Sequence, residues 1–423
     1  TIEAATDFSW LSQGDNVFLK LSLNSGIGFP ATTDPWLLKC MIKLMYEKGA
    51  KKVLVGDQSG AEYVILTKYL KRGSSRTLCS KAGLLDVILQ NGAQPVFFEE
   101  KGYYDYFCVK PQKPHHWPKP LYITKKLKQF DHIIYLPRVG AHVLADFSAG
   151  MKIAVGFLRD DSRLVMHNGG KNFYAMYEEI NRITQIKSKL RLIVSSGLKV
   201  LTTIGPDFGH VSKPDYGLIF ASDDLLAHDA MSYAWLRWNY EHNTPQSAKV
   251  AAQANRGRTA LNEGLMDVFF IGVRGYNIVP KRLPTNDCLP KIYLHRAMKN
   301  YVDRVGGCPQ NIAWNQITQN PSPSVQSYMS DIMNIPQKTD SIFGIEENTF
   351  AHGQRKYDPF SANGFQIKLN GKYNYRITDL KGSVIEYGNG KDIRRVGTHL
   401  SPGVYTLKVN SVIGNFSRKI IKK

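Results

Sequence analysis

The sequence predicts an α/β fold, with a mostly parallel or mixed sheet flanked by helices, followed by a small C-terminal immunoglobulin-like β-sandwich. Apolar strand patterns alternate with helical patterns through most of the chain, which indicates a sheet covered by helices. The final part instead holds short strands with period-2 alternation, separated by turn residues. We therefore predict an α/β domain over 1–310, a linker or irregular extension over 311–360 and a β-sandwich over 361–423.

The first elements predict a β-α-β unit. The segment 16–23, "NVFLKLSL", alternates apolar and polar residues and predicts a strand. A helix follows, because Asp34 is a suitable N-cap, Pro35 fits the first helical position and Gly49 ends the apolar repeat. The next buried-strand pattern, "KKVLVGD", places Asp57 at its carboxyl end.

Further strands and helices continue the alternation. Four more strands are predicted over 94–100, 130–137, 190–197 and 216–224. We expect a second helix at about 80–91, a Lys- and Pro-rich loop over 109–120, and a later helix capped by Ser222. The apolar residues of that later helix keep helical spacing, as its Leu226 and Ala230 show.

Composition limits the classes of partner. The formal net charge is +20, with basic residues concentrated in 101–130 and 361–423. Such a surface suits nucleic acid, anionic lipid or acidic surface glycans, although a solvated face is the simpler interpretation. No nucleic-acid-binding motif accompanies the charge, so we predict no nucleic-acid partner. No apolar run approaches the ~18 residues of a transmembrane segment. The chain begins at Thr1 without a signal-like segment, which suggests a processed form or a removed address.

The five cysteines are far apart and form no Cys-x-x-Cys pair. Iron–sulfur clusters need clustered thiolates, so we expect no such cluster. The odd number leaves at least one free thiol, and the sequence does not settle disulfide pairing.

The end of the chain carries three motifs in a fixed order: "YNYRITDLKGSVIEY", then "LSPGVYTLKV", then the basic strand "SRKIIKK". The second contains a Leu-x-x-Gly-x-Tyr element made of Leu400, Gly403 and Tyr405. This region resembles the C-terminal sorting domain of the type IX secretion system of Bacteroidetes. The resemblance implies handling by the type IX secretion machinery and an extracellular or outer-membrane surface location.

A second resemblance covers residues 14–275. It is carried by "GAKKVLVGDQSG", "DHIIYLPRVGAHVLADFSAGMKIAVG", "GPDFGH" and "ASDDLLAHDA", which are similar to the family catalogued as domain of unknown function 362. Leu21 stands where the family favours Pro, and Gly140-Ala141 stand where it has Lys before His142. The resemblance implies membership of the family but no particular activity.

Polar residues at predicted strand ends form the candidate site, because ligand sites of open α/β sheets gather there. Imidazoles with carboxylates suit a divalent metal, and a nearby lysine supplies a fixed cation or, if desolvated, a nucleophile. The candidate catalytic residues are Lys152, His142 and Lys20. The candidate metal ligands are His142, His167, Asp57, Asp224 and Asp229.

Each of these residues also has an ordinary structural interpretation. His142 fits a hydrogen-bonded histidine at the edge of the core, and Lys152 fits a side chain that extends along an apolar helix. Asp224 fits a helix-surface partner of His228, four residues away. Asp229 fits an inward-pointing carboxylate that needs a buried partner.

Two hypotheses for function remain open. The first is an exported metal- or anion-binding enzyme with its site at the carboxyl ends of the strands. The second is a non-catalytic cell-surface structural or assembly component that contacts anionic glycans or other surface proteins.

Overall fold

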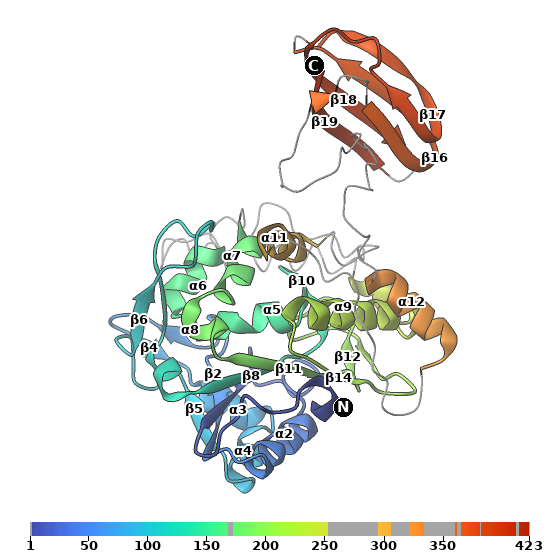
Figure 1. Cartoon of the computed structure of the whole chain (residues 1–423). Helices are drawn as coiled ribbons and strands as arrows, with labels where there is room; N and C mark the ends of the chain where they lie inside the picture. Colours follow the sequence, from blue (N-terminus) through green and yellow to red (C-terminus); the bar gives the residue numbers. More distant parts are fainter. Residues whose placement is uncertain are drawn as a thin grey trace. The chain divides into compact units, whose positions relative to one another are not determined.

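The computed structural model describes residues 2–167, 172–252, 295–305, 321–333, 360–361, 365–380, 382–411 and 414–422 (Figure 1). The chain forms two compact units, Thr1–Asn334 and Ile335–Lys423. Among the described residues, no helix combines the length and the apolar character needed to cross a membrane.

A six-stranded mixed sheet forms the centre of the first unit. Its strands, in sheet order, are β14 (Ile219–Ser222), β11 (Leu190–Ser196), β8 (His132–Leu136), β1 (Asn16–Leu21), β2 (Lys52–Asp57) and β5 (Gln94–Phe97). All neighbouring pairs are parallel except β11 and β14, which are antiparallel. The predicted α/β fold with a mixed sheet is confirmed.

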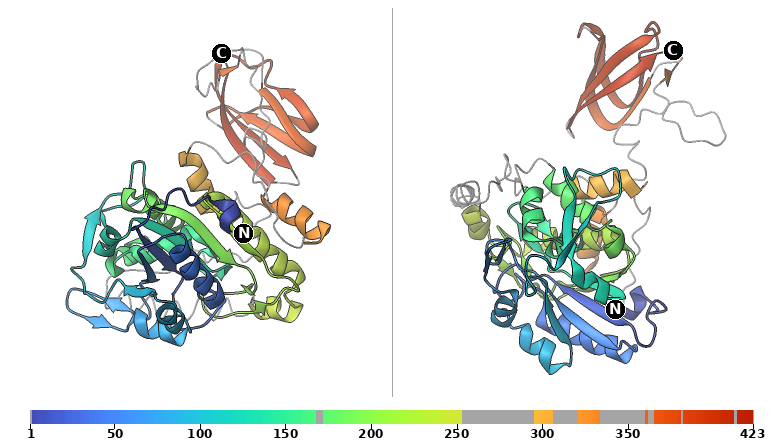
Figure 2. Two further views of the ribbon diagram at one scale, coloured as in Figure 1. Left: turned by 60° about the horizontal axis from the view of Figure 1, so that its bottom comes forward. Right: turned by 90° about the vertical axis from the view of Figure 1, so that its left-hand side faces the viewer.

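Helices cover both faces of this sheet (Figures 1 and 2). One layer consists of α2 (Pro35–Glu47), α3 (Ser75–Lys81) and α4 (Leu85–Gln90). The other contains α5 (Gly150–Ile153), α6 (Asp160–His167), α7 (Phe173–Ile180), α8 (Thr184–Lys187) and α9 (Leu225–His242). Because both faces are covered, β1 is buried from Val17 to Leu21, as expected for a central parallel strand.

The two faces of β1 have different chemistry. Leu19 belongs to the apolar core that includes Leu38 and Met41 of α2. Phe18 and Lys20 point to the opposite face, because successive side chains alternate along a strand. On that face the Phe18 ring stacks on Phe130 at a centroid distance of 4.1 Å. Lys20 is therefore a buried charge on an otherwise apolar strand.

Short elements complete the first unit. The short strands are β3 (Ile65–Leu66), β4 (Lys71–Arg72), β6 (Tyr106–Val109), β7 (Leu121–Thr124), β9 (Gly140–His142), β10 (Asp146–Ser148), β12 (Val200–Leu201) and β13 (Val211–Ser212). The remaining helices are α1 (Ile2–Ala5), α11 (Arg296–Val305), α12 (Pro323–Met333) and the 3-10 helices η1 (Lys125–Gln129) and η2 (Ala154–Phe157).

Two local predictions were wrong. The helix expected at about 80–91 is two helices, α3 and α4, because Gly83 adopts a φ of 75° between them. The cap of α9 is Asp224, which accepts a hydrogen bond from Ala227 N at 2.7 Å. Ser222 instead accepts a bond from the backbone N–H of Asp224.

The predicted linker over 311–360 lies mostly outside the described residues. Within the described part, α12 packs against α9, and its Val325, Met329 and Ile332 are buried. Cys40, Cys79 and Cys108 are free thiols, whereas the other two cysteines lie outside the described residues.

The second unit is a five-stranded sheet in the order β15 (Phe360–Ser361), β19 (Gly414–Lys422), β18 (Gly403–Ser411), β16 (Phe365–Thr378) and β17 (Val384–Val396). All pairs are antiparallel except β15 with β19, and the unit is consistent with a small β-sandwich. Leu400 is buried in its core, Gly403 opens β18, and the Tyr405 hydroxyl donates to Ser401 O at 2.9 Å.

Candidate functional site

A cavity of about 60 Å³ lies at the carboxyl ends of β1, β2 and β8. This volume holds roughly four to six water molecules. The lining residues are Ser22, Leu23, Asn24, Asp57, Gln58, Gly60, Arg138, His142, Ser148, Lys152, Ile153, Val155, Gly156, Arg163 and Pro206. The position agrees with the expected location of a ligand site in an open α/β sheet.

Lys20 and Asp57 form a buried ion pair at the edge of the cavity. Lys20 Nζ lies 2.6 Å from Asp57 Oδ1 and also donates to Leu21 O at 2.9 Å. Asp57 accepts two backbone N–H groups as well, from Leu23 at 3.1 Å and from Gln58 at 2.7 Å. Burial lowers the pKa of Lys20 to about 8, and the carboxylate of Asp57 opposes that shift. The pair is thus charge-balanced and well hydrogen-bonded.

Gly156 makes room for this ion pair. A Cβ atom at position 156 would overlap both Asp57 Oδ1 and Lys20 Nζ. The absence of a side chain in η2 therefore allows α5 and η2 to lie directly over the ends of β1 and β2.

Arg163 of α6 is a fixed positive charge in the cavity wall. Its guanidinium donates to the carbonyl oxygens of Gln58 at 2.9 Å, Gly156 at 3.0 Å and Leu158 at 3.0 Å, and also to that of Ser59. These partners are neutral, so they fix the guanidinium without cancelling its charge. Arg163 joins the loop after β2 to η2.

Lys152 of α5 lines the cavity as a half-buried amine. No residue in the described part of the chain forms a hydrogen bond or an ion pair with it. Burial lowers the pKa of Lys152 to about 7, and the positive charges of Arg138 and Arg163 act in the same direction. The carboxylates of Asp207 and Glu62 oppose the shift. Lys152 therefore lines the cavity without a direct hydrogen-bond or ion-pair partner among the described residues.

Asp229 fixes the start of the helix that carries Lys152. Its Oδ1 accepts Gly150 N at 2.7 Å and its Oδ2 accepts Met151 N at 2.9 Å. The same carboxylate lies 3.0 Å from Nδ1 of His228, whose Nε2 lies 3.0 Å from Ser195 Oγ. The sequence suggested an inward-pointing Asp229, and its buried partners are these groups.

His142 is a neutral hydrogen-bond donor in the cavity wall. Its Nδ1 accepts the backbone N–H of Leu144 at 3.1 Å, so the ring proton of the neutral imidazole is on Nε2. The pKa of His142 lies well below its usual value, because the ring is buried and because Lys152 and Arg138 are nearby. An Nε2–H group donates to an oxygen but offers no lone pair to a metal.

The structure brings together part of the predicted metal-ligand set, since Asp57 and His142 both line the cavity. Asp224 instead caps α9, and Asp229 accepts the N–H groups at the start of α5. His167 packs on the ring of Phe173 at 4.8 Å and is absent from the cavity lining, while burial lowers its pKa to about 3. Within the described ranges, no group of three or more His, Cys, Asp or Glu side chains could hold a metal ion.

Sequence reasoning missed two important residues. Arg138 lines the cavity, donates to Pro206 O, and is almost completely buried. Arg138 directly follows the predicted strand 130–137, and this position at a strand end could have identified it as a site residue. Asp207 accepts hydrogen bonds from Ser25 Oγ at 2.9 Å and from the Tyr63 hydroxyl at 2.9 Å. It thereby connects three loops at the cavity.

The fold and the cavity define an α/β protein with a basic strand-end site. The sequence model described as domain of unknown function (DUF362) matches residues 17–234, which is more than half of the 423-residue chain. The chain therefore belongs to this family, and the matched region contains every residue that lines the cavity. No curated protein and no solved structure matched the chain.

A second match identifies the end of the chain. The model of the secretion system C-terminal sorting domain matches residues 360–423. Both resemblances stated from the sequence are confirmed. The sorting domain implies that the type IX secretion machinery handles this protein, and that the protein is exported.

Gly140, one of the departures from the family pattern, has a local structural reason. A Cβ at position 140 would lie 3.0 Å from Leu201 Cβ and 3.2 Å from Leu201 O. The glycine therefore allows β9, which carries His142, to pair closely with β12.

Proposed function

We propose that this exported protein binds a small anion in its strand-end cavity. The observation that carries the proposal is the charge imbalance of the lining. Arg138, Lys152 and Arg163 line the cavity, and Asp57 is the one carboxylate among the lining residues. That carboxylate is already paired with Lys20. An anion would balance the charge of these three side chains, which form no ion pair with a carboxylate among the described residues.

The donors in the lining suit an oxyanion such as a carboxylate or a phosphate. A guanidinium can donate two parallel hydrogen bonds to such a group, and a lysine supplies a point charge. His142 adds a neutral Nε2–H donor. The guanidinium groups of Arg138 and Arg163 and the Nε2–H of His142 suit a metal ion poorly, because they present protons or positive charge rather than lone pairs.

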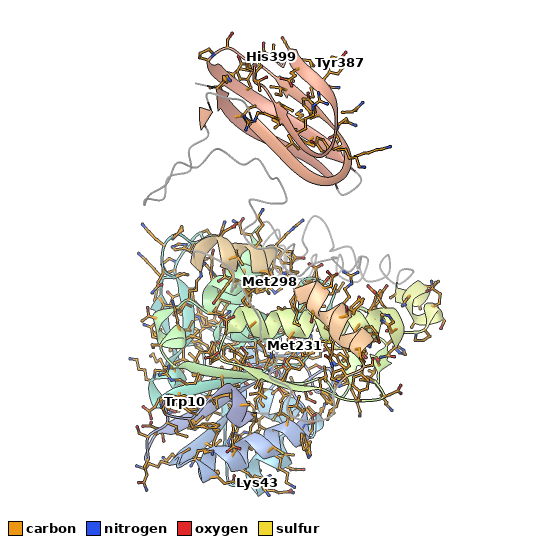
Figure 3. All side chains as sticks on the ribbon, turned by 45° about the vertical axis from the view of Figure 1, so that its right-hand side comes forward. Trp10, Lys43, Met231, Met298, Tyr387 and His399 are labelled. Carbon is orange, nitrogen blue, oxygen red and sulfur yellow. The ribbon has the colours of Figure 1, made fainter. Side chains whose placement is uncertain are left out.

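Calorimetric titration of the full chain with oxalate and with inorganic phosphate tests this proposal. We expect saturable binding of at least one of them, weakened at least tenfold in Lys152→Met and in Arg138→Met. Lys43→Met is the matched control, because Lys43 is an exposed lysine on α2 (Figure 3). Circular dichroism would verify that the variants are folded.

Two outcomes would contradict anion binding in the cavity. One is the absence of saturable heat with both anions. The other is equal affinity for the wild type, Lys152→Met and Lys43→Met, which would indicate diffuse binding to the basic surface. Repeating the titration at higher salt separates binding to the basic surface from binding in the cavity, since exposed charges are screened more strongly than a partly buried site.

A further inference from the structure

We infer that Lys152 forms a covalent imine with a small carbonyl compound that carries a carboxylate, the class of the 2-oxo acids. This inference rests on the proposed anion site and names the chemistry of its ligand. The observation behind it is a lysine that lines a cavity, has no hydrogen-bond or ion-pair partner within the described residues, and shares the lining with the guanidinium of Arg138.

The local charges favour a reactive amine at Lys152. An amine attacks a carbonyl carbon only in its neutral form. Arg138, Arg163, His142 and His167 lie near Lys152 on the loop after β8, α6 and β9. No carboxylate pairs with Lys152 directly among the described residues, although the charges of Asp207 and Glu62 raise its pKa. With its pKa lowered to about 7, a substantial fraction of Lys152 is neutral at neutral pH.

Lys20 shows why burial alone is not enough. It is more deeply buried than Lys152, but its Nζ contacts Asp57 Oδ1 and it is absent from the cavity lining. An amine held at 2.6 Å by a carboxylate stays protonated and has no path to a carbonyl carbon. The inference therefore applies to Lys152 and excludes Lys20.

Size and polarity of the cavity limit the ligand. A volume of about 60 Å³ corresponds to roughly four to six water molecules, which matches the few non-hydrogen atoms of the smallest 2-oxo acids. Arg138 would bind the carboxylate. The Nε2–H of His142 would donate a hydrogen bond to the carbonyl oxygen, or to the oxygen that forms from it.

The covalent step balances without an oxidant or a reductant. The lone pair of neutral Lys152 attacks the carbonyl carbon, a C–N bond forms, and the C=O π electrons move to the oxygen. Proton transfer from nitrogen to oxygen gives a carbinolamine. The hydroxyl group then leaves as water while a C=N bond forms. The products are one imine and one water molecule.

Reductive trapping tests the inference. The full chain is incubated near neutral pH with glyoxylate and cyanoborohydride, which converts an imine into a stable carboxymethyl-lysine, and is then mapped by peptide mass spectrometry. We expect Lys152 to be labelled at least tenfold faster than exposed Lys43. Acetaldehyde lacks the carboxylate, so its preference for Lys152 over Lys43 should be weaker than that of glyoxylate.

Two readouts on the wild-type chain separate this inference from the proposed anion site. Oxalate offers carboxylates but no aldehyde or ketone carbon, so its binding reports on the anion site alone, whereas carboxymethylation by glyoxylate reports on the imine. Labelling of wild-type Lys152 no faster than that of Lys43, with oxalate binding intact, would overturn the imine and leave the anion site standing. If the wild type showed neither oxalate binding nor preferential labelling of Lys152, both proposals would be overturned.

Discussion

Two lysines lie near the same edge of the sheet, and they differ above all in their partners. At the ends of β1 and β2, Lys20 is paired with Asp57 and hydrogen-bonded to Leu21 O. In the neighbouring cavity wall, Lys152 has a lowered pKa as well but lacks a partner among the described residues. Burial lowers the pKa of both lysines. Their partners decide whether the amine is held within the structure or remains available to a ligand.

The largest expected effect comes from breaking the ion pair between Lys20 and Asp57. Asp57→Asn leaves Lys20 as a buried charge without its counter-ion, which typically costs about 3–5 kcal/mol of unfolding free energy. Urea unfolding followed by circular dichroism measures the loss in the first unit. The double variant Lys20→Met, Asp57→Asn should recover a large part of the stability. A double variant as unstable as the single one would show that the ion pair is not the cause.

The next largest effect concerns Asp229, which holds the start of the helix that carries Lys152. Asp229→Ala removes the acceptor of two buried N–H groups, Gly150 N and Met151 N, and should cost about 2–4 kcal/mol. It should also weaken oxalate binding, because α5 loses its anchor. Asp224→Ala is the control, since it removes the cap of α9 at a cost of about 1 kcal/mol and should leave oxalate binding unchanged. Equal affinity in both variants would contradict the positioning role of Asp229.

A smaller effect tests how closely Gly156 packs against Lys20 and Asp57. Gly156→Ala inserts a methyl group where Lys20 and Asp57 lie, so we expect a loss of about 1–3 kcal/mol. Gly28→Ala provides the comparison, because its Cβ would meet nothing closer than Ala82 O at 3.8 Å. Thermal and urea unfolding of both variants measures the difference, and similar losses would argue against tight packing at Gly156.

The last comparison concerns the pH dependence of stability at Lys152. The pKa of Lys152 is about 7 in the folded chain and 10.5 as its ordinary value, so between these values the unfolded chain holds a proton that the folded chain lacks. Stability contributed by this group therefore rises with pH through that window and is lowest below it. Relative to Lys152→Met, the wild type should gain unfolding free energy from about pH 7 to about pH 9. A pH-independent difference between the two would contradict the lowered pKa.

The sequence was informative where a local pattern determines the structure. The strand patterns of 51–57 and 130–137 located two strand ends, and Asp57, His142 and Lys152 line the cavity there. Such patterns arise because buried parallel strands are apolar along their length. The C-terminal motif around Gly403 was equally informative.

The sequence failed where distant contacts decide a residue's role. Asp224 and Asp229 have the chemistry of metal ligands, yet a helix cap needs the same short carboxylate, and only the three-dimensional contacts separate the two uses. Asp207 meets Ser25 across 182 residues of sequence and Tyr63 across 144, so no short-range pattern could reveal its position.

The Asp207 contacts have a consequence for the motions of the cavity. One carboxylate joins the loop after β1, the segment after β2 and the 205–209 turn, through Ser25 and Tyr63. Any opening that releases one loop must loosen the others, so the three should exchange their amide protons for deuterium as one cooperative group. A bound molecule would slow that exchange in all three loops together, which reveals occupancy without any assay of turnover.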